Sequence, residues 1–323
     1  MPVLYLTEDE VRRLLTMEAA LGAVEAGLRA LGLDEAANVP RSRCQTDHVM
    51  LHLLAAAAKP LGVLGFKAYT TTRREARFHV TLYDGRSGEM TALIEADHLG
   101  RMRTGAASGV ATRHMALPGA RTVGVFGTGR QARTQLLAVC KVRDVRRVHV
   151  YSPTPEHRSA FAAEMSEACR TEVVPVSQPY DAAANMDIVI TATTSREPVL
   201  HGDWLAEGTH LNVIGSNFLS KAEIDVQTLR RANVVVVDSK DQARLEAGDF
   251  VAALEQGALH WSDVRELSQV VAGRCPGREH PHDITLFKSL GLGIEDVAVA
   301  ARVVELARAE GVGREILGSE EGT

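Results

Sequence analysis

The sequence is poor in cysteine, and its cysteines form none of the usual metal-binding or redox motifs. It contains four, Cys44, Cys140, Cys169 and Cys275, and no two of them make a CxxC pair. We therefore expect reduced thiols and no metal site. Two histidines flank a proline in the segment 280–283, which favours a solvent-facing loop over a ligand cluster. His52 alternates with apolar residues, and partial exposure is its simpler interpretation.

The chain also lacks a long apolar run and an excess of positive charge. No apolar stretch approaches the roughly 20 residues that span a bilayer, and the segment 1–15 has acidic residues where a secretory signal would be basic. A total of 36 Lys and Arg against 41 Asp and Glu gives a net charge of −5, which favours neither nucleic acid nor an anionic membrane as partner. These absences predict a cytoplasmic protein with no nucleic-acid or membrane partner.

The residues that are present indicate two domains of different kinds. A length of 323 residues exceeds that of one typical core. Residues 7–10 form a capping box that begins a helix running to about residue 31. The segment 48–94 contains four short strand-like runs separated by turn residues, which predicts an antiparallel meander. Small helix-forming residues fill 96–116, and Leu117-Pro118-Gly119 ends that helix at a domain boundary.

The later part of the chain has the pattern of a parallel sheet. Short runs rich in Val and Ile, such as 122–126 and 147–151, alternate with helical segments. Such strands are typical of a sheet covered by helices on both faces, so we expect an α/β protein with a doubly wound Rossmann domain. The earlier part predicts an α+β domain. A further periodic helix at about 294–309 could pack on that earlier domain, although periodicity alone does not decide this.

A glycine-rich segment after the strand 122–126 predicts a dinucleotide site. The residues Gly127-Thr128-Gly129-Arg130-Gln131-Ala132 match G-x-G-x-x-A and open a helix. Gly127 permits the tight turn, Gly129 lets a pyrophosphate approach the backbone, and Ala132 allows helix and strand to pack closely. The helix N-terminus adds unpaired amides and the positive end of a dipole. A turn that merely tightens the junction is the alternative.

The end of the next strand favours NADP(H) as cofactor, with NAD(H) possible. The acidic residue that binds the ribose hydroxyls of NAD is missing after residues 147–151. Ser152 and Thr154, with Arg158 one turn later, could receive a 2′-phosphate, although Thr154 could also simply cap a helix. Thr193 and Gly215 stand at later strand ends, where we expect the nicotinamide. FAD is less favoured because its fingerprint usually opens a chain.

In the earlier domain, cationic residues occur where they could bind a small ligand. Lys67 interrupts the apolar run Gly65–Tyr69, and burial of an ammonium costs several kcal/mol unless another interaction offsets it. A strand-edge lysine that reaches water is the alternative. Arg103 stands among small residues that allow close approach, and Arg41 and Arg43 flank the start of the meander.

Taken together, six segments resemble the ornithine cyclodeaminase/mu-crystallin family. They occur in the family's order and cover nearly the whole chain: GFKAY, RMRTGAASGVAT, VFGTGRQA, VIGSNFLSKAEID, VDSKDQA and ITLFKSLGLGIEDVAVA. The resemblance implies a homodimer. It also implies that residues 1–118 and 294–323 form a substrate-binding and dimerisation domain, into which a Rossmann domain at 119–293 is inserted.

The resemblance further implies roles for individual residues. Arg43, Lys67 and Arg103 would hold the carboxylate of a small substrate, and Thr104 would contact the cofactor phosphates. Because a lysine can shift its pKa and exchange protons, Lys67 is the candidate acid/base. The last matching segment also contains Lys288 and Asp296, whose roles the sequence leaves open.

One expected substrate-binding residue, Asn217, departs from the family pattern. True ornithine cyclodeaminases have an aspartate there, which grips the distal amine of ornithine. A neutral amide supplies no counter-charge to an ammonium. We therefore expect an NAD(P)-dependent oxidoreductase that transfers hydride between nicotinamide and the α-carbon of a small imino or amino acid, as a ketimine reductase or L-amino-acid dehydrogenase does. A cyclodeaminase-type lyase that uses NAD catalytically and a mu-crystallin-like ligand-binding protein are the alternatives.

Overall fold

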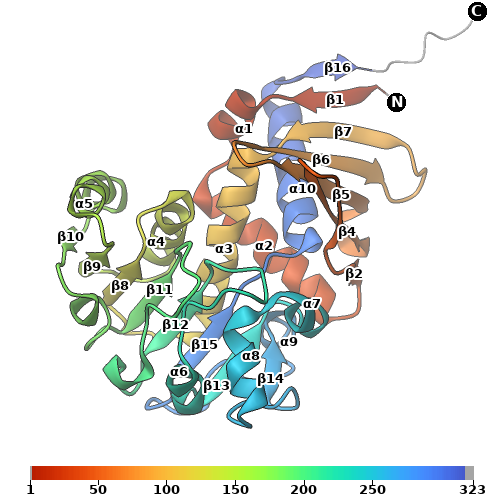
Figure 1. The fold of residues 1–323 in the computed structure, drawn as a ribbon. Coiled ribbons are helices and arrows are strands. Elements are labelled where there is room, and N and C mark those ends of the chain that lie inside the picture. The colour runs from red at the N-terminus through yellow and green to blue at the C-terminus, as the bar shows by residue number, and fades with distance from the viewer. Residues whose placement is uncertain (1, 317–323) are drawn as a thin grey trace, which may run out of the picture. The chain divides into compact units, whose positions relative to one another are not determined.

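The chain folds into two compact units (Figure 1). The computed structural model describes residues 2–316. The first unit contains Met1–Arg103 and Gly291–Thr323, and the second contains Thr104–Leu290. The sequence pattern predicts domain boundaries at 118 and 293, next to the ends of helices. The contacts within the chain instead place the first boundary between Arg103 and Thr104, inside helix α3 (Asp97–Met115).

A mixed sheet forms the larger part of the first unit. Its strand order is β16-β1-β7-β6-β5-β4-β2, and β3 also pairs with β4. The strands are β1 (Val3–Leu6), β2 (Ala36–Asn38), β3 (Ser42–Gln45), β4 (Met50–Ala58), β5 (Val63–Thr71), β6 (Ala76–Asp84), β7 (Met90–Glu95) and β16 (Arg314–Ile316). The run from β4 to β7 pairs antiparallel throughout, which confirms the predicted meander.

Helices α1 (Glu8–Leu14), α2 (Met17–Gly32) and α10 (Gly293–Glu310) complete the first unit. The capping box of Thr7 and Glu10 is confirmed at the start of α1. The prediction of a single helix to residue 31 is wrong, because the hydroxyl of Thr16 accepts a hydrogen bond from the Ala19 amide and begins a second helix. Helix α10 packs on α2 and on strands β4 and β5.

The two faces of the first unit's sheet differ in burial. Lys67 on β5 lies directly opposite Leu54 and Val80, and all three are buried. The alternate residues Leu53 and Leu64 point to the other face and are 39% and 40% exposed. Because side chains alternate along a strand, the sheet has one face under α10 and one face that is apolar but open.

The second unit contains the predicted parallel sheet, in the order β10-β9-β8-β11-β12-β15-β13-β14. The strands are β8 (Thr122–Phe126), β9 (Arg147–Tyr151), β10 (Glu172–Pro175), β11 (Ile188–Thr191), β12 (His210–Val213), β13 (Val234–Val237), β14 (Val264–Glu266) and β15 (Thr285–Lys288). Every pairing in it is parallel, which confirms the doubly wound Rossmann class. The order reverses at β8, which lies between β9 and β11, and ligands bind at such reversals.

Helices cover this sheet over two apolar cores. The helices are α4 (Arg130–Val142), α5 (Pro155–Cys169), α6 (Val226–Arg231), α7 (Lys240–Glu246), α8 (Gly248–Glu255) and α9 (Leu267–Val271), besides α3. One core joins Leu136 of α4 and Phe161 of α5 to the sheet, and the other contains Phe250 of α8. Among residues 2–316, every helix is too short or too polar to cross a membrane.

Candidate functional site

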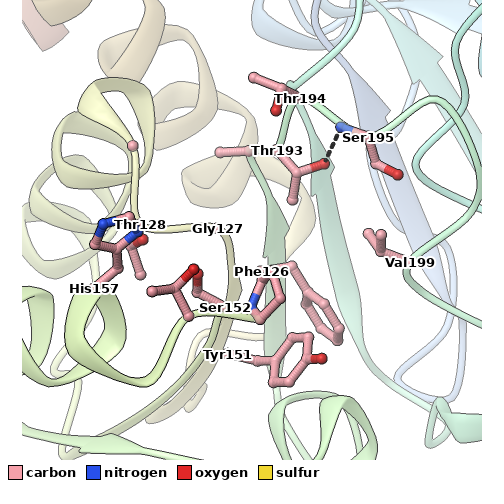
Figure 2. A pocket seen from close by; sticks show the side chains of 14 residues that line it. Phe126, Gly127, Thr128, Tyr151, Ser152, His157, Thr193, Thr194, Ser195 and Val199 are labelled. Carbon is pink, nitrogen blue, oxygen red and sulfur yellow. Dashed lines mark hydrogen bonds between the residues drawn. The ribbon is translucent and has the colours of Figure 1, made fainter.

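A pocket of about 430 Å³ lies at the carboxyl ends of β8, β9 and β11 in the second unit (Figure 2). The cofactor-binding residues predicted from the sequence divide into two groups. Six of them line this pocket, namely Gly127, Thr128, Gly129, Ser152, Thr154 and Thr193. Five do not, namely Thr104, Arg130, Gln131, Arg158 and Gly215. Sequence reasoning missed His157 and Val199, because only the fold brings these side chains to the strand ends.

The glycine turn at the pocket has the geometry that the motif predicts. Gly127 has a φ of 99°, and a Cβ there would lie 2.5 Å from the carbonyl oxygen of Ala192, so only glycine fits. Gly129 is the N-cap of α4, where no side chain caps the helix. A Cβ on Gly129 would meet no atom within 4 Å. The space beside Gly129 at the N-terminus of α4 is therefore open to a pyrophosphate.

Small residues on α3 allow α4 to approach closely within the second unit. A Cβ on Gly105 would lie 2.4 Å from the carbonyl oxygen of Thr134. The side-chain amide of Gln135 donates to the carbonyl of Thr104 over 3.0 Å. Thr104 therefore lies beside the first turns of α4, although it does not line the pocket.

The end of β9 offers hydroxyls and no carboxylate. Ser152 is buried, and Thr154 is the N-cap of α5 although its side chain makes no capping hydrogen bond. The guanidinium of Arg158 donates to the carbonyl of Ser152 over 2.7 Å. Among the described residues, no Asp or Glu lines the pocket. The alternative that the Thr154 hydroxyl caps α5 therefore has no hydrogen bond to support it.

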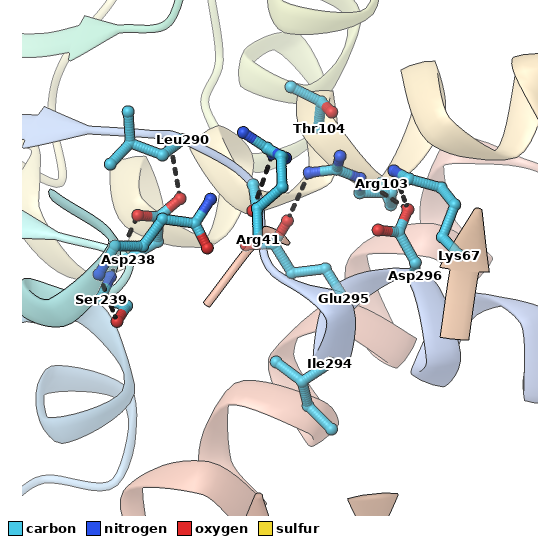
Figure 3. A network of polar contacts seen from close by, with 12 residues as sticks. Arg41, Lys67, Arg103, Thr104, Asp238, Ser239, Leu290, Ile294, Glu295 and Asp296 are labelled. Carbon is cyan, nitrogen blue, oxygen red and sulfur yellow. Dashed lines mark hydrogen bonds and ion pairs between the residues drawn. The ribbon is translucent and has the colours of Figure 1, made fainter. Parts of the chain in front are cut away.

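The first unit contains a buried cluster of cations and carboxylates (Figure 3). The ammonium of Lys67 donates to Asp296 Oδ1 over 2.7 Å, so the alternative that this lysine reaches water is wrong. Arg103 donates through Nε to the same oxygen over 2.9 Å and through Nη1 to Glu295 Oε2 over 2.8 Å. Both carboxylates stand in the first turn of α10, where the helix dipole favours negative charge.

This environment changes the pKa of both basic groups. Burial and the neighbouring Arg103 lower the pKa of Lys67 to about 7, although Asp296 acts in the opposite direction. Burial opposes the charge of Arg103, but Asp296 and Glu295 raise its pKa above the usual value. Lys67 can therefore exchange a proton near neutral pH, while Arg103 stays a permanent cation.

Two further arginines differ in their position. Arg41 is buried and donates to the carbonyl of Gly291 over 3.3 Å. Arg43, on β3, is half-buried and donates to Nδ1 of His52 over 3.1 Å. The expectation that His52 is partly exposed is wrong, because β4 turns it to the covered face, where it stacks on Tyr69 with ring centroids 4.1 Å apart. Burial and the charge of Arg43 lower the pKa of His52 to about 4, so this ring is neutral.

Asp296 has a carboxylate oxygen that accepts no hydrogen bond from the described residues. Asp296 Oδ2 is buried and has no hydrogen-bond partner there, because Lys67 and Arg103 both bind Oδ1. Arg41, Lys67 and Arg103 are three cations against the two carboxylates of Glu295 and Asp296. A small anion with a hydrogen-bond donor on its nitrogen matches this set of groups.

Known proteins resemble the chain over nearly its full length. A Δ1-pyrroline-2-carboxylate reductase of Bacillus cereus is 32% identical, over 97% of this chain and 99% of the relative. The structure of a Thermococcus litoralis Δ1-pyrroline-2-carboxylate reductase in complex with NADH and L-proline has a TM-score of 0.92 and 33% identity, and the match covers 97% of this chain and 100% of that one. An archaeal alanine dehydrogenase dimer with bound NAD has a TM-score of 0.91 and 32% identity, over 98% and 99%.

The family model matches residues 3–311. This match confirms the resemblance of the six ordered segments, which lie within that range. The chain belongs to the ornithine cyclodeaminase/mu-crystallin family.

Proposed function

We propose that the protein is an NAD(P)-dependent oxidoreductase that interconverts a small imino acid and the corresponding amino acid. The observation that carries this proposal is the buried Lys67, which shares Asp296 with Arg103 and has a pKa near neutrality. The relatives support it, since their names describe reduction of a cyclic imino acid and dehydrogenation of alanine. The relative with bound L-proline also supports a small amino acid as the reduced product.

The residues of the first unit divide the work on the substrate. Arg103, with Arg41 or Arg43, binds the substrate carboxylate. Lys67 donates a proton to the nitrogen side of the substrate during reduction and accepts one in the reverse direction. Asp296 holds Lys67 in place through Oδ1 and offers Oδ2 to a protonated substrate nitrogen. An imino acid has both the carboxylate and the basic nitrogen that these groups require.

The pocket of the second unit fits a nicotinamide dinucleotide, which supplies or accepts the hydride when it is bound. Thr128 and Gly129 would hold the pyrophosphate with the amides of α4, and Thr104 stands nearby on α3. We favour NADP(H) over NAD(H), because Ser152 and Thr154 replace the carboxylate that would bind a free ribose 2′-hydroxyl. Two relatives have NADH or NAD bound, so an experiment must exclude a preference for NAD(H) in this protein.

A comparison of kcat/KM for NADPH and NADH tests the cofactor preference. We expect NADPH to be preferred, and we expect the variant Arg158→Met to lose part of that preference. The guanidinium of Arg158 is held beside Ser152, where a 2′-phosphate would bind. A preference for NADH that Arg158→Met leaves unchanged would contradict this assignment.

Net reduction distinguishes the proposed reaction from that of a cyclodeaminase. Asn217 follows β12 in a loop that would contact the substrate, and its amide provides no charge for a second amine. We therefore expect consumption of NAD(P)H with cyclic imines or with 2-oxo acids and amines. Conversion of ornithine without net change of the nicotinamide would instead support the lyase.

We also propose that the protein is a homodimer, joined through the open face of the first unit's sheet. Val39, Leu53 and Leu64 are exposed there, and a hollow of about 310 Å³ is lined by apolar side chains such as Phe66. An apolar face of this kind is typical of a protein interface. The alanine dehydrogenase relative is described as a dimer, which supports the proposal.

A further inference from the structure

A buried chain of charged groups connects three neighbouring strand ends of the second unit. Lys288, the last residue of β15, forms an ion pair with Asp249 Oδ2 over 2.8 Å and donates to the carbonyl of Ser216 over 2.8 Å. Asp249 Oδ1 in turn accepts the backbone amide of Glu223 over 2.6 Å. All three charged side chains are at least 96% buried, so water does not screen these contacts.

Glu223 is the member of this chain that reaches the dinucleotide pocket. Its Oε1 accepts the amide of Thr193 over 2.6 Å and the hydroxyl of the same residue over 2.7 Å. Its Oε2 accepts the hydroxyl of Thr191 over 2.8 Å and the amide of Gly215 over 2.6 Å. One carboxylate thus accepts four hydrogen bonds and joins the end of β11 to the end of β12, while Thr193 lines the pocket.

The backbone of Gly215 packs closely against Glu223 and against the Thr193 segment. A Cβ on Gly215 would lie 2.3 Å from Glu223 Oε1 and 2.4 Å from the carbonyl oxygen of Thr193. Burial and the charge of Asp249 raise the pKa of Glu223, while Lys288 and the bonds from Thr193 lower it. Burial of three charged side chains costs free energy, and apolar packing could hold the two loops without that cost. The use of charged groups indicates that the positions of these loops matter for function.

We propose that Glu223, anchored by Asp249 and Lys288, is a positioning residue that fixes the Thr193 segment against the nicotinamide half of the dinucleotide. The inference rests on the proposed function. The adenosine half would be held on the other side of β8, by the glycine turn and by the end of β9. The carboxylate of Glu223 accepts its hydrogen bonds from Thr191, Thr193 and Gly215, so its effect belongs to one half of the cofactor.

Binding of the intact cofactor and of its adenosine half separates this role from a structural one. The dissociation constants of NADPH and of adenosine 2′,5′-bisphosphate, its adenosine half, are measured by calorimetry for the wild type and Glu223→Gln. In this variant the side-chain NH₂ group faces one of the two backbone N–H groups that donate to Glu223 in the wild type. Two donors cannot form a hydrogen bond with each other, so one bond is lost. We expect NADPH to bind about tenfold more weakly, as the loss of one charge-assisted hydrogen bond predicts, and the fragment to bind within twofold of wild type.

Two further variants make the result decisive. Thr191→Val removes one hydroxyl donor to Glu223 without touching the pocket lining, and it should show the same selective loss to a smaller degree. Glu255→Gln, an exposed position on α8, should change neither constant. If Glu223→Gln and Thr191→Val weaken both ligands equally, or weaken neither, the positioning role is wrong. A wild type that binds no nicotinamide dinucleotide contradicts the proposed function as well.

Discussion

Lys67 stands where an apolar side chain would pack well, since its two cross-strand neighbours are Leu54 and Val80. Lys67→Met keeps most of the side-chain volume and removes the exchangeable proton. We expect turnover to fall about 10²- to 10⁴-fold, the usual contribution of a general acid or base, with dinucleotide affinity unchanged. Steady-state kinetics and calorimetry on the same preparation measure both quantities.

The matched control is Lys59→Met, because Lys59 is exposed in the 3₁₀ turn Lys59–Leu61. It should leave turnover and binding as in the wild type. Retained turnover in Lys67→Met would remove this lysine from the mechanism.

The pKa of Lys67 gives the reaction opposite pH profiles in its two directions. Reduction needs the ammonium form, so its kcat/KM should fall as the pH rises through about 7, where burial and Arg103 place the pKa. Oxidation of the amino acid needs the neutral amine and should lose activity below that pH. The charge of Arg41 also lowers the pKa of Lys67, whereas Asp296 raises it. Asp296→Asn should therefore move both midpoints to lower pH, and midpoints that stay in place would exclude Lys67 as the titrating group.

At the scale of elements, local chemistry predicts the glycine turn at the start of α4. Gly127→Ala forces a side chain into a left-handed backbone against the Ala192 carbonyl, so we expect the free energy of unfolding to fall by about 1 to 3 kcal/mol. Gly129→Ala meets no protein atom and should lose less stability, only what alanine costs at an N-cap, yet bind the dinucleotide more weakly. Denaturant unfolding and calorimetry distinguish the two effects. Equal loss of stability in both variants would show that Gly129 is needed for the fold and not for the ligand.

Elements with strong local patterns are predictable from the sequence, and elements defined by distant partners are not. The meander 48–94 and the strands β8 to β13 follow from apolar periodicity and turn residues. The sequence pattern does not indicate strands β14 and β15, because their three and four residues lack a distinguishing period, although β15 lies between β12 and β13. The break at Thr16 was missed because the apolar pattern continues across it.

The same holds for the candidate site: its local motif is predictable from the sequence, and its contacts between distant residues are not. The motif at 127–132 predicts its own part of the pocket because all its determinants are local. Asp296 and Lys67 are separated by 229 residues, and sequence reasoning named both without joining them. Glu223 was missed entirely, since its significance lies in four hydrogen bonds to two strand ends.

At the scale of the whole molecule, the open face of the first unit's sheet bears on assembly. Leu53→Asp places a charge on that apolar face, and burial of an unpaired carboxylate in an interface is costly. We expect the molar mass in sedimentation to fall from that of two chains toward the 34.8 kDa of one. Leu245→Asp, at a position 59% exposed on α7 of the second unit, should leave the mass unchanged. A wild-type protein that sediments as one chain would contradict the dimer.

The proposed reaction is the reduction of an imino acid by a nicotinamide dinucleotide, with Lys67 as the proton donor. The most direct measurement follows NADPH and NADH oxidation, through the nicotinamide absorbance, with Δ1-pyrroline-2-carboxylate as substrate while proline is quantified in parallel. We expect one cofactor to be oxidised for each proline formed in the wild type, and we expect turnover to be about 10²- to 10⁴-fold lower in Lys67→Met. Absence of cofactor oxidation with cyclic imines and with 2-oxo acids plus amines, by a protein that still binds the dinucleotide, would contradict the proposed reaction.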